Sequence, residues 1–116
     1  MNRNTQEKLE ALHQAYVESL PDKVIEIESY WKEIEQGSYN EELWQDFYRA
    51  VHSLAGSSGT FGFNNLCQVL FNLETFLKKF EEEFPVDEDK QTITKLLFKV
   101  RETLMLEMSN KNHKSL

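Results

Sequence analysis

Residues 43–62 read LWQDFYRAVHSLAGSSGTFG, and this segment carries the clearest structural pattern in the chain. Four apolar side chains lie three or four residues apart in it: Leu43, Phe47, Ala50 and Leu54. That spacing places them on one face of an α-helix, within roughly 40° of Leu43 at about 100° per residue. His52 falls at roughly 180° on the same helical wheel. We therefore predict a helix that buries the apolar stripe and points His52 towards solvent.

Similar apolar stripes precede and follow this segment, and no stretch alternates as a β-strand would. The expected elements are a short helix from about Asn4 to Leu20, a helix from Pro21 to Gly37, a helix capped by Asn40, a helix over residues 66–80 and a last helix that begins at Asp87 or Asp89. Consecutive helices with short connections pack antiparallel. We therefore predict an all-α fold, an antiparallel up-down four-helix bundle with an additional short N-terminal helix. The domain is expected to span residues 5–108, with residues 109–116 as a polar C-terminal tail or linker.

The chain has 116 residues and a formal net charge of −7, from 20 acidic and 13 basic residues. This length suits one domain, and the acidic balance argues against binding to nucleic acid or to an anionic membrane. The single cysteine, Cys67, excludes an intrachain disulfide and a paired-cysteine metal site. No glycine-rich phosphate loop, membrane-length apolar run or signal peptide is recognisable. The sequence thus predicts a cytoplasmic domain that binds no metal.

Two glycines follow His52 on the face that the helix is predicted to expose. Gly56 lies one turn after the histidine, and Gly59 lies about a turn further on. A glycine inside a helix is about 1 kcal/mol less favourable than alanine, so the presence of two glycines here needs an explanation. The missing side chains would let a partner backbone or a phosphoryl group approach the imidazole. Close helix packing is the alternative explanation, but both glycines are predicted to lie on the wrong face for it.

The tract from His52 to Gly62 resembles the signature of histidine phosphotransfer (HPt) domains, which reads His-x-Leu-Lys-Gly-x-Ser/Ala with a further glycine and usually Phe-Gly or Leu-Gly. Residues 60–63, Thr-Phe-Gly-Phe, are similar to the phosphotransfer domain of chemotaxis histidine kinases. The resemblance covers residues 5–108. It implies a phosphorelay protein of two-component signal transduction. Such a protein would accept a phosphoryl group on Nε2 of His52 and exchange it with receiver-domain aspartates.

The resemblance also implies what the domain leaves to its partners. The chain would be a phosphotransfer intermediate rather than a self-sufficient enzyme, and it would need no cofactor of its own. The Mg²⁺ ion is expected on the partner receiver or kinase domain. The expected partners are response-regulator receiver domains, a histidine kinase domain, or both. A monomer is expected, with neither nucleic acid nor a membrane as a partner.

By the same resemblance, Glu74, 22 residues after His52, would hydrogen-bond Nδ1–H and orient the imidazole. A solvated surface glutamate is the alternative. The lysine that the family carries three residues after the histidine is Ala55 in this chain. Lys78, one turn after Glu74, would then stabilise the phosphoryl group, with Arg49 as a second candidate. For both cations, a plain solubilising charge is the alternative.

Docking to a receiver domain in this family uses an apolar patch around the histidine. The residues expected to form that patch are Gly56, Gly59, Tyr48, Trp44, Phe71, Phe63 and Cys67. Partly exposed aromatic side chains suit an interface of this kind. A widened bundle core is the alternative explanation, and for Trp44 the two explanations are equally well supported.

Three other functions remain open at the level of sequence. The HPt substrate domain of a larger, chemotaxis-type or hybrid histidine kinase, loaded from ATP, is favoured by residues 60–63 and by Glu74. A non-catalytic helical domain that binds receivers is favoured by Ala55. A metal-binding helical bundle is disfavoured, because no Glu-x-x-His pair is predicted to face inwards.

Overall fold

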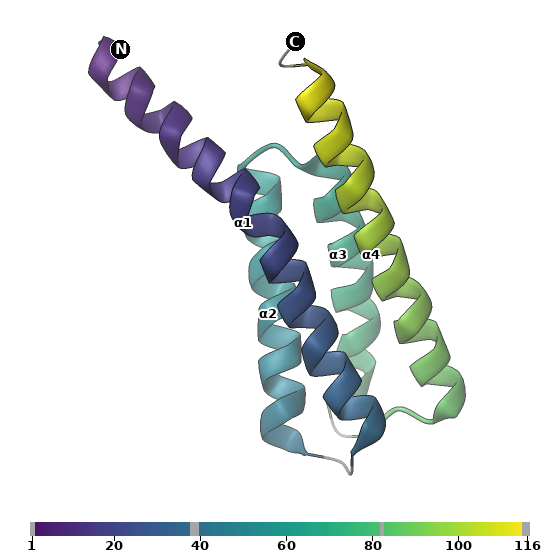
Figure 1. Cartoon of the computed structure of the whole chain (residues 1–116). Coiled ribbons are helices and arrows are strands. Elements are labelled where there is room, and N and C mark those ends of the chain that lie inside the picture. The colour runs from purple at the N-terminus through teal and green to yellow at the C-terminus, as the bar shows by residue number, and fades with distance from the viewer. Residues whose placement is uncertain (1, 38–39, 82, 115–116) are drawn as a thin grey trace.

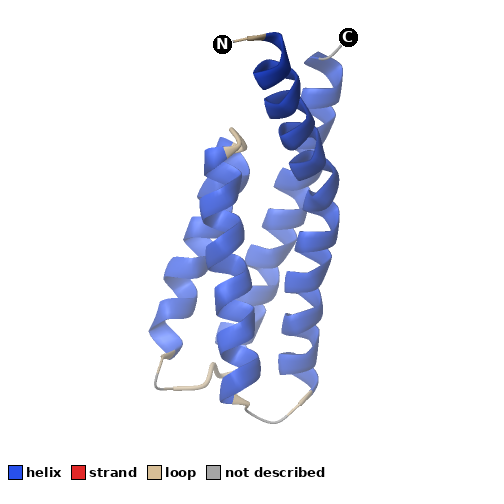
Figure 2. Cartoon of the chain, turned by 90° about the vertical axis from the view of Figure 1, so that its left-hand side faces the viewer, coloured by secondary structure: helices blue, strands red, loops and turns tan. Residues whose placement is uncertain are grey.

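Helices account for nearly all of the chain that the computed structural model describes, which is residues 2–37, 40–81 and 83–114. They are α1 (Arg3–Gln36), α2 (Glu41–Thr60), α3 (Asn64–Leu77), the 3₁₀ turn η1 (Lys78–Phe80) and α4 (Asp87–Lys114). These ranges contain no β-strand (Figure 2), which confirms the all-α prediction. Within the same ranges, no helix is both long enough and apolar enough to cross a membrane.

The four α-helices run side by side, and successive helices point in opposite directions (Figure 1). Each helix packs against two others, since α1 and α3 both contact α2 and α4. The apolar stripes of all four helices fill the space between them with fully buried side chains: Leu20, Ile27, Phe47, Val51, Leu66, Leu70, Leu73, Ile93 and Val100. Full burial of such a side chain is worth about 1.5–3 kcal/mol relative to exposure. This burial is the main force that holds the helices together.

The predicted separate N-terminal helix is wrong, because α1 continues through Pro21 without interruption. A proline removes one backbone hydrogen bond from a helix. However, Leu20 and Val24 on either side of it are buried in the core. Packing of this stripe against the bundle holds the helical conformation across the proline. The first turns of α1 extend past the connection between α2 and α3 (Figure 1 and Figure 2), and residues 2–12 are exposed.

Several helix boundaries follow from capping residues that are visible in the sequence. The Asn40 side chain accepts a hydrogen bond of 3.1 Å from the backbone N–H of Leu43, which confirms the predicted cap of α2. Gly37 ends α1, as expected. Gly62, between α2 and α3, has a φ of 86°. Because residues with a side chain rarely adopt this conformation, the tight connection between these two helices favours glycine.

The last helix begins at Asp87 and is longer than expected. The carboxylate of Asp89 accepts a hydrogen bond of 3.2 Å from the backbone N–H of Val86, which caps the first turn. The helix reaches Lys114, so most of the expected tail, residues 109–116, has helical backbone. The last two residues of that tail lie outside the described part of the chain.

Helix α3 is capped by a side chain from α4. Phe63, which precedes its first residue, makes no side-chain cap. Instead, the carboxylate of Glu107, only 8% exposed, accepts a hydrogen bond of 2.5 Å from the backbone N–H of Leu66. A carboxylate is favourable at the positive end of a helix. The contact joins residues 41 positions apart and fixes the start of α3 relative to α4.

Replacing Glu107 by alanine is expected to lower the free energy of unfolding by about 1–3 kcal/mol, because a buried backbone N–H loses its charged acceptor. Urea denaturation followed by circular dichroism measures the change. Glu102→Ala is the matched control on the same helix, since its carboxylate pairs with Lys99 at the surface. Such exposed pairs contribute about 1 kcal/mol at most. Equal effects of the two substitutions would contradict the capping role of Glu107.

Candidate functional site

His52 lies at the edge of the buried face of α2. The buried residues of this helix are Trp44, Phe47, Val51, Leu54, Ala55 and Ser58. Leu43 and Ala50, which the predicted stripe included, are only partly buried. At about 100° per residue, the centre of the observed stripe is roughly 110° from His52 rather than opposite it. The imidazole side chain is 67% exposed, as predicted, but its position at the edge also brings it next to α3.

Glu74 on α3 holds the imidazole of His52. Its Oε1 atom is hydrogen-bonded to ring nitrogen Nδ1. The two partners differ in exposure, because the side chain of Glu74 is 6% exposed and that of His52 is 67% exposed. This burial rules out the alternative of a solvated surface glutamate. With the Nδ1 proton donated to the carboxylate, Nε2 is the unprotonated nitrogen and can act as a nucleophile.

Gly59 permits the close approach of α2 and α3 near this pair. A Cβ atom added to Gly59 would lie 3.0 Å from Sγ of Cys67 on α3. The pairings of His52 with Glu74 and of Gly59 with Cys67 belong to one antiparallel register of the two helices. This corrects the expectation that Gly59 lies on the wrong face for helix packing, because Gly59 and Cys67 face each other across the helix contact, where both are partly buried.

Three residues of the expected docking surface do surround His52 at the surface. Gly56 is open, since an added Cβ would meet no atom within 4 Å. Phe71 on α3 is 53% exposed and, in the register of α2 and α3, lies level with the turn that follows His52. Tyr48 is half-buried, and its ring is nearly parallel to the imidazole, at 11° with 6.3 Å between centroids.

Trp44 and Phe63 are core residues, which corrects the prediction that they contribute to docking. Trp44 is 4% exposed and packs edge-on against Phe47 and Phe80, at centroid distances of 5.7 and 6.1 Å. Phe63 is fully buried and lies 6.1 Å from the ring of Tyr16. Both aromatic rings face inwards and fill the core, Trp44 near the start of α2 and Phe63 between α2 and α3.

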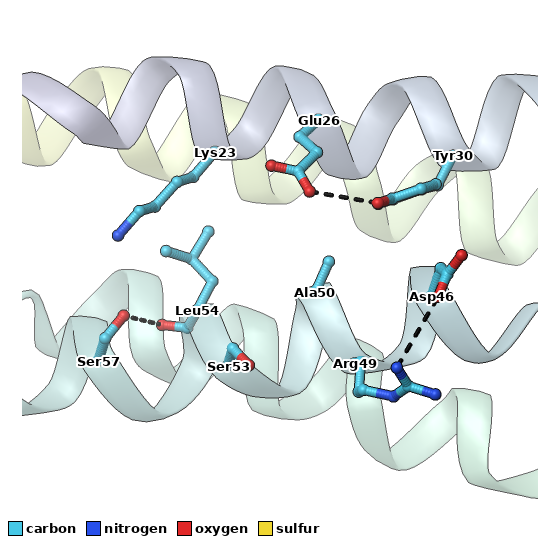
Figure 3. Close-up of a pocket in the computed structure, with 9 residues that line it drawn as sticks. All are labelled: Lys23, Glu26, Tyr30, Asp46, Arg49, Ala50, Ser53, Leu54 and Ser57. Atoms are coloured by element: carbon cyan, nitrogen blue, oxygen red, sulfur yellow. Dashed lines mark hydrogen bonds and ion pairs between the residues drawn. The ribbon is translucent and has the colours of Figure 1, made fainter. Parts of the chain in front are cut away.

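The two cations expected near His52 lie in different places. Lys78 is exposed on the 3₁₀ turn after α3, level with Tyr48 in the register of α2 and α3. Arg49 instead lines a groove of about 450 Å³ between α1 and α2, where it pairs with Asp46 at 3.9 Å (Figure 3). Arg49 is therefore on the α1 side of α2, whereas Glu74 approaches His52 from α3. The structure does not bring Arg49 to the histidine pair.

One contact close to this region has no counterpart in the sequence-based prediction. The hydroxyl oxygens of Tyr16 on α1 and Ser57 on α2 lie 2.8 Å apart, and burial raises the pKa of the Tyr16 phenol. Tyr16 and Ser57 are 41 residues apart in the chain. No periodic pattern connects two such positions.

The described residues contain no group of three or more His, Cys, Asp or Glu that could hold a metal ion.

Comparison with models of known protein families gives a match over residues 4–108 to the family described as Hpt domain. The matched region contains His52, Glu74 and the greater part of all four α-helices. Comparisons with curated proteins and with solved structures gave no match. The family assignment therefore rests on the whole length of the bundle rather than on the short tract around the histidine.

Gly56→Ala is expected to raise the free energy of unfolding by about 0.5–1 kcal/mol, because alanine is the better helix former. Gly56 lies inside α2, and the added Cβ would meet no atom within 4 Å. Thermal denaturation compares this variant with Gly59→Ala, whose added Cβ would lie 3.0 Å from Cys67 Sγ. The second variant should gain less stability or lose some. A destabilised Gly56→Ala protein would mean that the fold itself requires this glycine.

Proposed function

The chain belongs to the Hpt domain family, and we propose from this that it relays a phosphoryl group through His52. Hpt domains are histidine phosphotransfer modules of two-component signalling and not catalytic enzymes in the usual sense. In phosphorelays they interact with receiver domains and histidine kinases. For this chain, His52 is the phosphoacceptor, and receiver-domain aspartates are its donors and acceptors.

The hydrogen bond between His52 and the buried Glu74 is the observation that carries the proposal. In an ordinary surface histidine, no hydrogen bond to a fixed partner selects one of the two neutral tautomers. Here a carboxylate that is 6% exposed holds one ring nitrogen. The other nitrogen is thereby presented in a defined direction and without a proton, which is what a positioned nucleophile requires.

The transfer step can be written with every bond accounted for. Nε2 of His52 uses its lone pair to attack the phosphorus of an aspartyl phosphate on a receiver domain. The N–P bond forms as the bond between phosphorus and the aspartate oxygen breaks, and that electron pair leaves with the aspartate carboxylate. The ring then bears the phosphoryl group on Nε2 and a proton on Nδ1, so it is formally cationic. The Glu74 carboxylate stabilises this charge, and the reverse step passes the phosphoryl group to a second receiver.

The chain's own contribution is position and a surface for docking. The Mg²⁺ ion that neutralises the transferring phosphoryl group is assigned to the partner receiver or kinase domain. Gly56 leaves the helix bare beside His52, so that a partner backbone can come close. Phe71, 53% exposed, offers apolar area on the neighbouring helix. Such an exposed aromatic side chain beside a reactive group suits a protein interface.

Lys78 is the cation proposed to stabilise the phosphoryl oxygens. Ala55 stands where the family signature carries lysine, and it is 6% exposed. Lys78 is exposed and follows Glu74 by one helical turn. The whole chain has a net charge of −7, yet residues 47–80 carry three basic residues and one acidic residue, for a local charge of +2. This local balance tolerates the negative charge of a phosphohistidine.

Two donors are compatible with this chemistry, and they can be separated in one experiment. In a relay, the donor is an aspartyl phosphate of a receiver domain, which acetyl phosphate can charge. In a larger chemotaxis-type or hybrid kinase, the donor is ATP bound to a histidine kinase domain. The chain is incubated with a panel of charged receivers in one arm and with kinase domains and ATP in the other. A purely helical docking domain would bind receivers and acquire no phosphate in either arm.

His52→Gln is expected to abolish the acid-labile phosphate that the chain acquires from a charged receiver, because glutamine has no nucleophilic ring nitrogen. Phosphate is quantified by Phos-tag electrophoresis before and after acid treatment. His13→Gln is the control, since His13 packs beside Phe61 and Phe63 at centroid distances of 6.1 and 6.3 Å. It should load as the wild type does. Wild-type loading of His52→Gln would refute the assignment of the phosphoacceptor.

Glu74→Gln is expected to slow phosphoryl transfer roughly 10- to 100-fold, because a hydrogen bond to a charged group is worth about 1.5–3 kcal/mol. The amide can still accept from Nδ1–H but cannot neutralise the phosphorylated ring. Rapid-quench kinetics with a charged receiver measure the rate. Glu102→Gln, at an exposed position on α4, is the control for a changed net charge. Equal rates in the two variants would remove Glu74 from the proposed site.

A further inference from the structure

Two contacts between α2 and α3 lie along one line of the interface. Gly59 faces Cys67 near the connection between the two helices, and His52 meets Glu74 further along the bundle. Gly59 follows His52 by seven residues on α2, and Glu74 follows Cys67 by seven residues on α3. Seven residues make nearly two full helical turns, so the two positions on each helix project within roughly 20° of each other. The two contacts therefore share one face of α2 and one face of α3.

The contact at Gly59 leaves little room for a side chain. A Cβ atom at this position would lie 3.0 Å from Sγ of Cys67 and 3.7 Å from its Cβ atom. Because non-bonded heavy atoms pack best at about 3.5–4.0 Å, an alanine here would either displace the sulfur or push the two helices apart. Cys67 is partly buried, which limits how far its sulfur can turn away. Glycine thus allows a closer approach of α3 to α2 than a residue with a side chain would.

The hydrogen bond between His52 and Glu74 depends on this approach. A hydrogen bond from nitrogen to oxygen is favourable only over a range of about 0.5 Å in distance. The Glu74 side chain is buried among the leucines of α3, so close packing keeps it from extending freely if the helices separate. Both helices are continuous between the two contacts. A wider separation at Gly59 would therefore also widen the gap between His52 and Glu74.

We propose that Gly59 is a positioning residue of the phosphotransfer site. By letting Cys67 pack directly against the backbone of α2, it sets the separation of the helices at which Glu74 reaches Nδ1 of His52. Gly56 differs, because an added Cβ there would meet no atom within 4 Å. The inference rests on the proposed function, since it concerns how Nε2 is presented. It assigns Gly59 a role within the isolated domain, before any partner binds.

The first experiment measures the imidazole ¹⁵N chemical shifts of His52 in the unphosphorylated full chain. Gly59→Ala is expected to move them from the values of the Nδ1–H tautomer towards a mixture of tautomers, because the hydrogen bond to Glu74 that selects this tautomer is weakened. Gly59→Leu should move them further, since its larger side chain needs more space than one turned sulfur can provide. Gly56→Ala is the matched control on the same helix, and it should keep the Nδ1–H tautomer.

Removal of the sulfur atom tests whether space is the cause. Cys67→Ala makes room beside residue 59, because Sγ is the atom nearest to the added Cβ. In this background, Gly59→Ala is expected to leave the tautomer of His52 unchanged. The substitution at residue 59 is the same in both backgrounds, and only its neighbour differs. The comparison therefore separates crowding from any other effect of replacing glycine.

The second experiment measures phosphorylation of His52 by two donors. Phosphoramidate is a small donor that needs no docking, and its own bond between phosphorus and nitrogen breaks as the N–P bond to Nε2 forms and ammonia leaves. The other donor is a charged receiver domain. Gly59→Ala is expected to slow both reactions roughly 3- to 10-fold, because it weakens one hydrogen bond. Ser53→Ala, in the groove between α1 and α2 (Figure 3), is the control and should leave both rates unchanged.

Several outcomes would overturn the proposal. An unchanged tautomer in Gly59→Ala would do so, and so would slowing with the receiver alone, which would mark Gly59 as a docking residue. An undiminished effect of Gly59→Ala in the Cys67→Ala background would do the same. If Gly59→Leu fails to fold, Gly59→Ala decides the question by itself.

These results can be told apart from a failure of the proposed function. The tautomer measurement needs no phosphate, so it judges Gly59 even if His52→Gln shows that the phosphoacceptor is elsewhere. Conversely, normal loading on His52 with a silent Gly59→Ala would reject only this inference.

Discussion

A carboxylate buried between two helices is the constraint around which this surface is organised. Glu74 lies among buried leucines of α3, including Leu73 and Leu77, and an uncompensated charge there would be strongly destabilising. The oxygens of the Glu74 carboxylate therefore require a hydrogen-bond donor on the facing helix, α2. The ring nitrogen of His52 meets that requirement in the same register that places Gly59 against Cys67. The fold and the site thus share one set of contacts. Neither α2 nor α3 can shift along the other without separating His52 from Glu74.

The position of α3 depends in turn on α4. The Glu107 carboxylate reaches across to the first turn of α3 and replaces the missing side-chain cap at Phe63. Together with the buried leucines, this hydrogen bond sets how far α3 lies along the bundle axis. Glu107 lies on α4, which does not contact His52. Through α3 it nevertheless helps to set the position along the bundle at which Glu74 meets His52. Because the rest of the bundle fixes the position of α3, few residues need to contact the exposed imidazole of His52 to hold it.

Much of the fold could be predicted from the sequence, because apolar periodicity and capping residues act locally. Asn40 and Gly37 define helix ends in the way their chemistry predicts. The outward position of His52 and its pairing with Glu74 were also accessible, the first from periodicity and the second from family resemblance. What could not be predicted depends on neighbouring helices. The rotation of the α2 stripe towards Trp44, the contact of Gly59 with Cys67 and the cap from Glu107 are all set by residues distant in the chain.

The continuous α1 helix has a consequence for the local stability of the molecule. Pro21 has no N–H, so the carbonyl of Val17 lacks its usual partner and the ladder of backbone hydrogen bonds is interrupted there. Residues 2–12 are exposed, whereas Tyr16 and Leu20 before the proline and Ile27 after it are buried in the core. Amides in the first turns can therefore open by local fraying, and those around Ile27 exchange with solvent only when the bundle unfolds. The helix is continuous in shape but differs in local stability along its length, and the change lies between residue 12 and the buried Tyr16.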